Sequence, residues 1–148
     1  ESGEFDSGVI IHEGQLTWKA HGLHLILDLG VWWNENNDGL PLPLGGNVVR
    51  RDLGEEACEN ISEWVKMSIQ HSINKPEEAL KFALQWGRGI DEDTNSKFVK
   101  MYVNDRTIDY GTDGRASIRK FLADGIKIGM IDSQFDPNCL DFIGARVD

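Results

Sequence analysis

His12 is the residue of this chain whose type and position best suit catalysis. It follows the apolar, β-branched run 9–11, which predicts a short buried strand that ends at His12. In open α/β sheets, ligands bind beyond the carboxyl ends of the strands. A histidine there changes charge near neutral pH and can act as a general base. The alternative interpretation is a histidine that caps the following helix or is hydrogen-bonded within the core.

The other chemical signatures in the sequence are incomplete. The His-Glu pair at 12–13 begins like a zinc-protease helix, but Leu16 stands where the second histidine is required. The pair His21 and His24 has no cysteine or carboxylate set to complete a zinc site. The segment 91–102 begins like a calcium loop but lacks the glycine and the final glutamate of that loop. We therefore expect no metal ion.

Two further pairs of residues each allow two interpretations. Trp32 and Trp33 are suited either to lining an aromatic binding wall or to anchoring a short helix in the core. Arg50 and Arg51 are suited either to binding an anionic substrate or to a solvated strand end paired with nearby acids.

Composition restricts the class of protein. The 148 residues suit one domain, and 15 basic against 25 acidic residues give a net charge of −10. Such an acidic chain is poorly suited to nucleic acid, whose affinity comes mainly from phosphate neutralisation. No apolar run approaches the ~20 residues that span a bilayer, so we expect no membrane insertion. Two isolated cysteines and no secretory signal favour the cytoplasm.

Strand-like and helical segments divide the chain near residue 52. We expect three strands, at 9–12, 23–29 and 47–51, with an extended connector at 40–46 because its two prolines exclude a central strand or helix. Four helices should follow. The first is capped by Asp52 with Glu55 in capping-box spacing, the second begins at Pro76, and the others carry the apolar stripes of 98–103 and 118–126. Strands that are apolar on both faces belong in a helix-covered parallel sheet. Three of them rarely complete one, so we expect part of the fold to precede residue 1.

Several segments, taken in order, resemble one known family. These are 8–18 with its His-Glu-Gly run, 28–33 with the two tryptophans, 40–53 from the Leu-Pro-Leu-Pro connector to Arg50-Arg51-Asp52-Leu53, and then 76–80 and 102–104. In this order and spacing they resemble the 1,4-dihydroxy-6-naphthoate synthase family of menaquinone biosynthesis. The resemblance covers nearly the whole chain.

The resemblance implies an activity and a fold. The family converts cyclic dehypoxanthinyl futalosine to 1,4-dihydroxy-6-naphthoate with release of a three-carbon fragment, uses no metal or organic cofactor, and has a proposed histidine base that falls on His12. Its fold is α/β, the two-lobed type II periplasmic-binding-protein fold with the substrate between the lobes. Residues 1–43 would then form part of the small lobe. Residues 44–148 would form a crossover strand and the helical part of the large lobe.

The resemblance also places the remaining site residues. Glu13 beside the base, and Leu42, Pro43 and Leu44 on the connector, would face the substrate. The family chain is roughly twice as long, so this sequence matches its C-terminal half and lacks the N-terminal residues that grip the substrate.

Three hypotheses follow. The chain is one half of a lyase of this type, a non-catalytic solute-binding protein of the same fold, or a free-standing half-domain that associates with itself. We expect its partner to be either a second copy, in a homodimer, or the missing N-terminal half.

Overall fold

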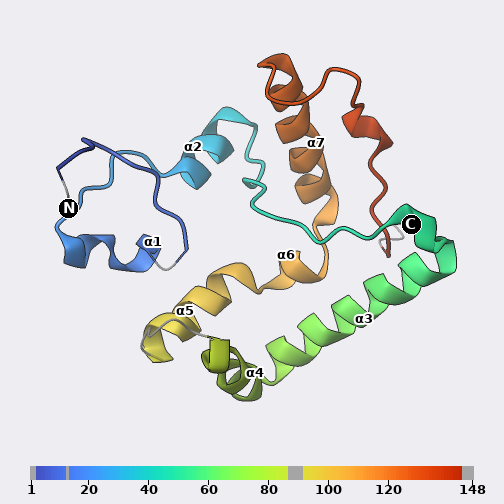
Figure 1. Cartoon of the computed structure of the whole chain (residues 1–148), viewed down its shortest axis with the longest axis horizontal. Helices are drawn as coiled ribbons and strands as arrows, with labels where there is room; N and C mark the ends of the chain where they lie inside the picture. Colours follow the sequence, from blue (N-terminus) through green and yellow to red (C-terminus); the bar gives the residue numbers. More distant parts are fainter. Residues whose placement is uncertain (1–2, 13, 87–91, 145–148) are drawn as a thin grey trace.

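Helices joined by irregular segments make up the computed structural model of the chain, which describes residues 3–12, 14–86 and 92–144 (Figure 1). The α-helices are α1 (Gly14–Thr17), α2 (Leu29–Asn36), α3 (Glu55–Asn74), α4 (Pro76–Ala83), α5 (Glu92–Tyr102), α6 (Asp105–Ile108) and α7 (Gly111–Lys127). Short 3-10 turns lie at Trp18–His21, Arg51–Leu53, Leu84–Trp86 and Pro137–Cys139. No helix in these ranges is long and apolar enough to cross a membrane.

The four helices predicted from the sequence are confirmed as α3, α4, α5 and α7. Pro76 occupies the first turn of α4, where a backbone N–H would have no acceptor within the helix, so proline costs no hydrogen bond there. The predicted start of α3 is wrong by two residues. Asp52 lies in a 3-10 turn and binds the Arg50 guanidinium, and Gly54, with a φ of 88°, precedes the first helical residue. The pairing of Asp52 with a neighbouring cation removes it as a cap.

The three predicted strands are wrong for this chain, since residues 9–12, 23–28 and 47–50 are irregular and the described ranges contain no β-strand. The described chain is therefore helix-rich rather than α/β. Backbone N–H and C=O groups form a strand only when another strand accepts and donates their hydrogen bonds. Ile26 is 81% exposed and Val48 is 96% exposed, so the apolar side chains that mark these segments remain in solvent.

A small core lies where α2, the connector 40–46 and α7 meet. Trp33 on α2 is 5% exposed and packs edge-to-face on Phe121 of α7, with ring centroids 5.5 Å apart. Trp33 is thus the core anchor of its helix, whereas Trp32 is exposed. Asp28 caps α2 by accepting bonds from the N–H groups of the second and third helical residues.

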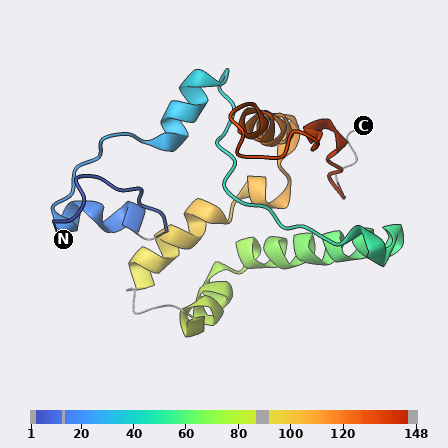
Figure 2. The same ribbon diagram turned by 45° about the horizontal axis from the view of Figure 1, so that its top comes forward.

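The C-terminal segment ties α7 to the beginning of α3. After α7 the chain turns back toward the first turns of α3, as both views show (Figures 1 and 2). The hydroxyl of Ser62 donates to the carbonyl of Ile143, and Arg51 forms an exposed ion pair with Asp141 at 2.6 Å. The arginine pair at 50–51 therefore meets acids of its own chain in solvent, which is the second of its two sequence interpretations.

The chain leaves much apolar surface uncovered. Its accessible surface is 12026 Å², whereas a compact protein of 16.6 kDa exposes roughly 7,600 Å². Among the described residues, Trp33 and Cys58 are the buried hydrophobic side chains. Trp64, which the sequence places on the apolar stripe of α3, is 66% exposed. The described chain therefore has a small core for a sequence in which 40% of the residues are hydrophobic.

Candidate functional site

His12 lies at the end of an irregular segment, two positions before α1 begins at Gly14. Its backbone has a φ of 56°, in the left-handed region that non-glycine residues rarely adopt. The N–H of Gln15 donates to the His12 carbonyl at 3.2 Å, which closes a turn around this strained position. The imidazole is exposed, so it is free to meet a ligand.

Gly14, at the start of α1, lies close to the side chain of Ile10. A Cβ added to Gly14 would lie 2.7 Å from Cγ2 of Ile10, closer than real Cβ contacts. A side chain at position 14 would therefore have to displace the side chain of Ile10. Glycine at this position allows Ile10 to pack against the start of α1.

Helix α5 supplies the surroundings of His12 (Figures 1 and 2). The Phe98 ring lies 6.4 Å from the imidazole, tilted by 52°, and the Tyr102 ring lies 4.8 Å from Phe98. The side-chain amide of Gln15 donates a 2.6 Å hydrogen bond to the Tyr102 hydroxyl. One hydrogen bond and two ring contacts thus connect His12 and Gln15 to α5. This helix begins 80 residues after His12 in the sequence.

The predicted substrate-binding residues do not gather around His12 in this structure. Glu13 lies outside the described residues. Leu42 and Pro43 are half-buried and Leu44 is exposed, on the connector that runs past α7, while the segment before α1 lies beside α5 (Figures 1 and 2).

A buried serine holds the connector in place. Ser117 is fully buried, and its hydroxyl donates to the Pro41 carbonyl at 2.6 Å while it accepts the indole N–H of Trp33 at 3.0 Å. Asn37, also buried, donates its side-chain amide to the Trp33 carbonyl. Sequence reasoning missed Ser117, because a serine amid the apolar stripe of a helix gives no signal of a distant partner.

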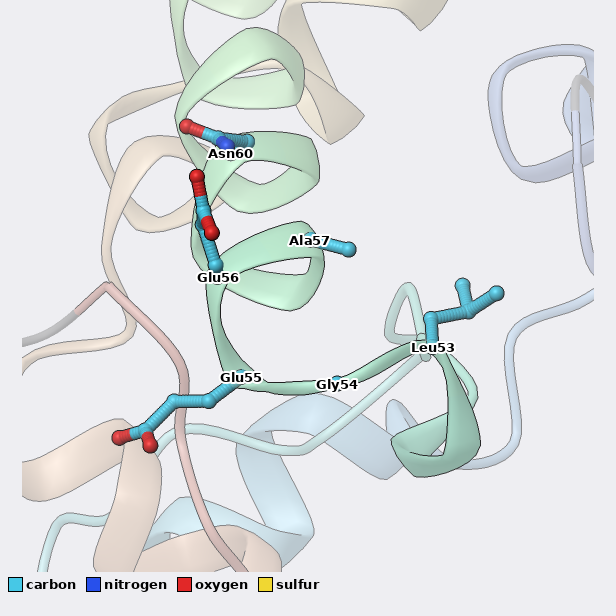
Figure 3. A pocket seen from close by; sticks show the side chains of 6 residues that line it. All are labelled: Leu53, Gly54, Glu55, Glu56, Ala57 and Asn60. Carbon is cyan, nitrogen blue, oxygen red and sulfur yellow. The ribbon is translucent and has the colours of Figure 1, made fainter.

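A shallow hollow lies at the beginning of α3 (Figure 3). Its lining residues are Leu53, Gly54, Glu55, Glu56, Ala57 and Asn60. It is widely open to solvent, and the two glutamates at a helix start would repel an anionic ligand. Within the described ranges, no three His, Cys, Asp or Glu side chains are grouped to hold a metal ion.

Most of the sequence of the chain matches one family. The model of a family described as menaquinone biosynthesis matches residues 1–125. The chain belongs to this menaquinone biosynthesis family. The match contains both 8–18 and 102–104, the two segments that meet beside His12.

Two curated relatives of the chain share one name. The chain is 36% identical over 128 residues to the 1,4-dihydroxy-6-naphthoate synthase of Thermus thermophilus, covering 86% of this chain and 47% of that protein. It is 33% identical over 140 residues to the Streptomyces coelicolor protein of the same name, covering 95% of this chain and 49% of that protein. The resemblance drawn from the sequence is confirmed, and the chain spans about half the length of these relatives.

A solved structure shares the arrangement of this family member. The crystal structure of a protein from Archaeoglobus fulgidus superposes with a TM-score of 0.76 at 39% sequence identity. The superposition covers 82% of this chain and 46% of that one. The helices described above are therefore arranged as in one half of a larger protein.

Proposed function

We propose that this chain is the C-terminal half of a lyase that forms 1,4-dihydroxy-6-naphthoate from cyclic dehypoxanthinyl futalosine, with His12 as its general base. The observation that carries the proposal is the exposed imidazole, held in a turn within a segment that the family match covers. The names of the two curated relatives support this reaction.

The reaction requires a correctly positioned base and a cleft that excludes water. A neutral imidazole has one ring nitrogen with a free lone pair, which can take a proton from the substrate. Removal of that proton starts an elimination that expels the three-carbon dihydroxyacetone fragment and leaves the aromatic naphthoate. A cleft that closes over His12 would exclude water and strengthen each polar contact in it. No step requires a metal ion or an organic cofactor.

The second half of the enzyme completes the cleft in this proposal. The segments 9–12, 23–28 and 47–50 expose apolar side chains and lack strand partners in the described chain. Strands supplied by the N-terminal half would pair with them and give the two-lobed fold, with residues 1–43 in the small lobe and 44–148 in the large lobe. Glu13, Leu42, Pro43 and Leu44 would then line the cleft between the lobes, in a cytoplasmic enzyme.

Replacement of the base tests the proposal. The chain would be joined to the N-terminal half of the Thermus thermophilus relative, and naphthoate formation followed with His12→Ala and with His71→Ala as the control. His71 is exposed in the last turn of α3. We expect His12→Ala to abolish turnover while the melting midpoint stays within a few degrees of the wild type. His71→Ala should retain turnover.

Two results would overturn the assignment. If His12→Ala retained more than about a tenth of the turnover, a deficit of only ~1.4 kcal/mol, His12 would not be the base. If the joined protein bound the substrate but no variant turned it over, the non-catalytic binding protein would be the better hypothesis.

A further inference from the structure

We propose that Tyr102 is a positioning residue for the base, acting on His12 through Gln15. The proposal rests on the proposed function, since it names a residue that supports the same site. Its basis is the contact of two segments that lie far apart in the sequence. Gln15 follows His12 by three residues, and its amide reaches the hydroxyl of Tyr102, 87 residues later, at 2.6 Å.

The turn that carries His12 needs external support. A φ of 56° is disfavoured for a residue with a Cβ, and such positions persist only where the surroundings fix them. Gln15 fixes the conformation of His12 through two hydrogen bonds. Its backbone N–H holds the His12 carbonyl, and its side chain holds Tyr102. Loss of the second contact frees the turn to relax and moves the imidazole with it.

Tyr102 is itself anchored, which is what a positioning residue requires. The hydroxyl of Thr107 donates to the Tyr102 carbonyl at 2.7 Å. The same hydroxyl accepts the backbone N–H of Asn104 in the capping box of α6. A continuous series of hydrogen bonds therefore runs from His12 through Gln15, Tyr102 and Thr107 to the start of α6.

The rings of α5 complete the support. Phe98 lies between the imidazole and Tyr102, at centroid distances of 6.4 and 4.8 Å. Removal of the tyrosine hydroxyl leaves these ring contacts in place and breaks only the polar contact to Gln15. Tyr102→Phe is thus a narrow probe of positioning, whereas loss of the whole side chain would also disturb the packing of α5.

Misplacement of a base slows chemistry without weakening substrate binding. In the assembled enzyme, Tyr102→Phe and Gln15→Leu should each lower kcat by between about 10- and 100-fold and leave KM within about twofold. The double variant should be no slower than the slower single variant, because both changes break one contact. Tyr110→Phe is the matched control, since the ring of this tyrosine packs on Phe142, with centroids 6.0 Å apart.

A spectroscopic measurement on the 148-residue chain tests the same contact without activity. The ring-proton NMR signal of His12 should shift in Tyr102→Phe and in Gln15→Leu, and should stay in place in Tyr110→Phe. Additive losses of kcat, a rise in KM with kcat unchanged, or an unmoved His12 signal would overturn the proposal. If the enzyme were inactive but the His12 signal shifted as expected, the proposed function would fail and the positioning contact would stand.

Discussion

The hydroxyl of Ser117 donates a 2.6 Å hydrogen bond to the carbonyl of Pro41, 76 residues earlier in the chain. The same hydroxyl accepts the indole N–H of Trp33, so one buried atom joins α7 to both α2 and the connector. Both partners would lose their bond if the serine were replaced. Because a buried polar group without a partner is costly, Ser117 fixes the path of the residues that follow Pro41.

We expect Ser117→Ala to destabilise the chain by about 1–3 kcal/mol, since it leaves the Pro41 carbonyl and the Trp33 N–H unpaired in the core. Urea unfolding followed by tryptophan fluorescence measures the change. The control is Ser72→Ala, because the Ser72 hydroxyl donates to the carbonyl of Ser68 within α3 and its loss should change the unfolding free energy little. Equal effects of the two variants would show that the link from α7 to the connector does not stabilise the fold.

Pro41 and Pro43 should matter for kinetics more than for stability. Proline restricts the backbone of the connector, and a stiffer connector would set how the two halves of the cleft meet. In the assembled enzyme, replacement of both by Ala should raise KM or slow closure, with a modest loss of stability. Pro137→Ala, in a turn after α7, is the control. Stability lost with unchanged kinetics would show that the two prolines serve only the fold.

The pair Arg106–Asp113 gives a pH dependence whose sign is fixed. Hydrogen bonds from the Arg106 guanidinium lower the pKa of Asp113 from 3.8 to about 2. Since the folded-state pKa lies below the unfolded value, this carboxylate stabilises the fold fully above the unfolded value and loses the effect as pH falls through about 2. Asp113→Asn should therefore lower the melting midpoint at pH 7 and match the wild type below about pH 2. Circular dichroism melts across this range measure the difference.

Replacement of the cation provides the control for that pair. Arg106→Gln should reproduce the loss at pH 7, because it removes the same ion pair. It should keep a small deficit in acid, because Arg106 also donates to the Tyr110 carbonyl at 3.2 Å. A difference between Asp113→Asn and the wild type that grew as pH fell would contradict the assigned cause.

The helices were predictable because their signals are local. The apolar stripes, and Pro76 at a first helical position, lie within each segment and required no knowledge of its neighbours. The strand signals in 9–12 and 23–29 are equally local, but a strand exists only with a partner, and the described chain provides none. Leu29 is instead the first residue of α2, and Asp28 is its N-cap. Asp28 is a typical N-cap residue, but the apolar run around it favoured a strand.

In the candidate site, the sequence singles out His12 but not the residues that contact it; the role of His12 stays a prediction. His12 is prominent in the sequence because of its type and its place after an apolar run. The support that reaches it from Tyr102 spans 87 residues, and no spacing in the sequence indicates such a contact. Tyr102 was visible only as part of an apolar helical stripe and of the family resemblance. Contacts between distant segments depend on how the helices pack, which periodicity alone does not specify.

Uncovered apolar surface leads to the last prediction, which concerns association. The chain exposes 12026 Å², against roughly 7,600 Å² for a compact protein of its mass. Large permanent interfaces bury about 2,000–5,000 Å² over both partners, or about 1,000–2,500 Å² per chain, so one such interface would remove a substantial part of the excess. Irregular apolar segments that lack a strand partner in the described ranges, such as 23–28, favour pairing with another chain. A second copy satisfies this demand when no N-terminal half is present.

We therefore expect the isolated 148-residue chain to be a dimer or larger at micromolar concentration, and to be inactive on cyclic dehypoxanthinyl futalosine. Exchange of residues 1–45 between two copies, across a hinge at Gly45-Gly46, is one route to such a dimer. Light scattering measures the mass. Addition of the N-terminal half of the Thermus thermophilus relative should compete with self-association and restore some turnover, whereas an unrelated acidic protein of the same size should do neither. A monomer with low binding of a hydrophobic dye and a cooperative melt would contradict this, because the chain would then close its own core despite the exposed side chains of Trp64, Ile26 and Val48.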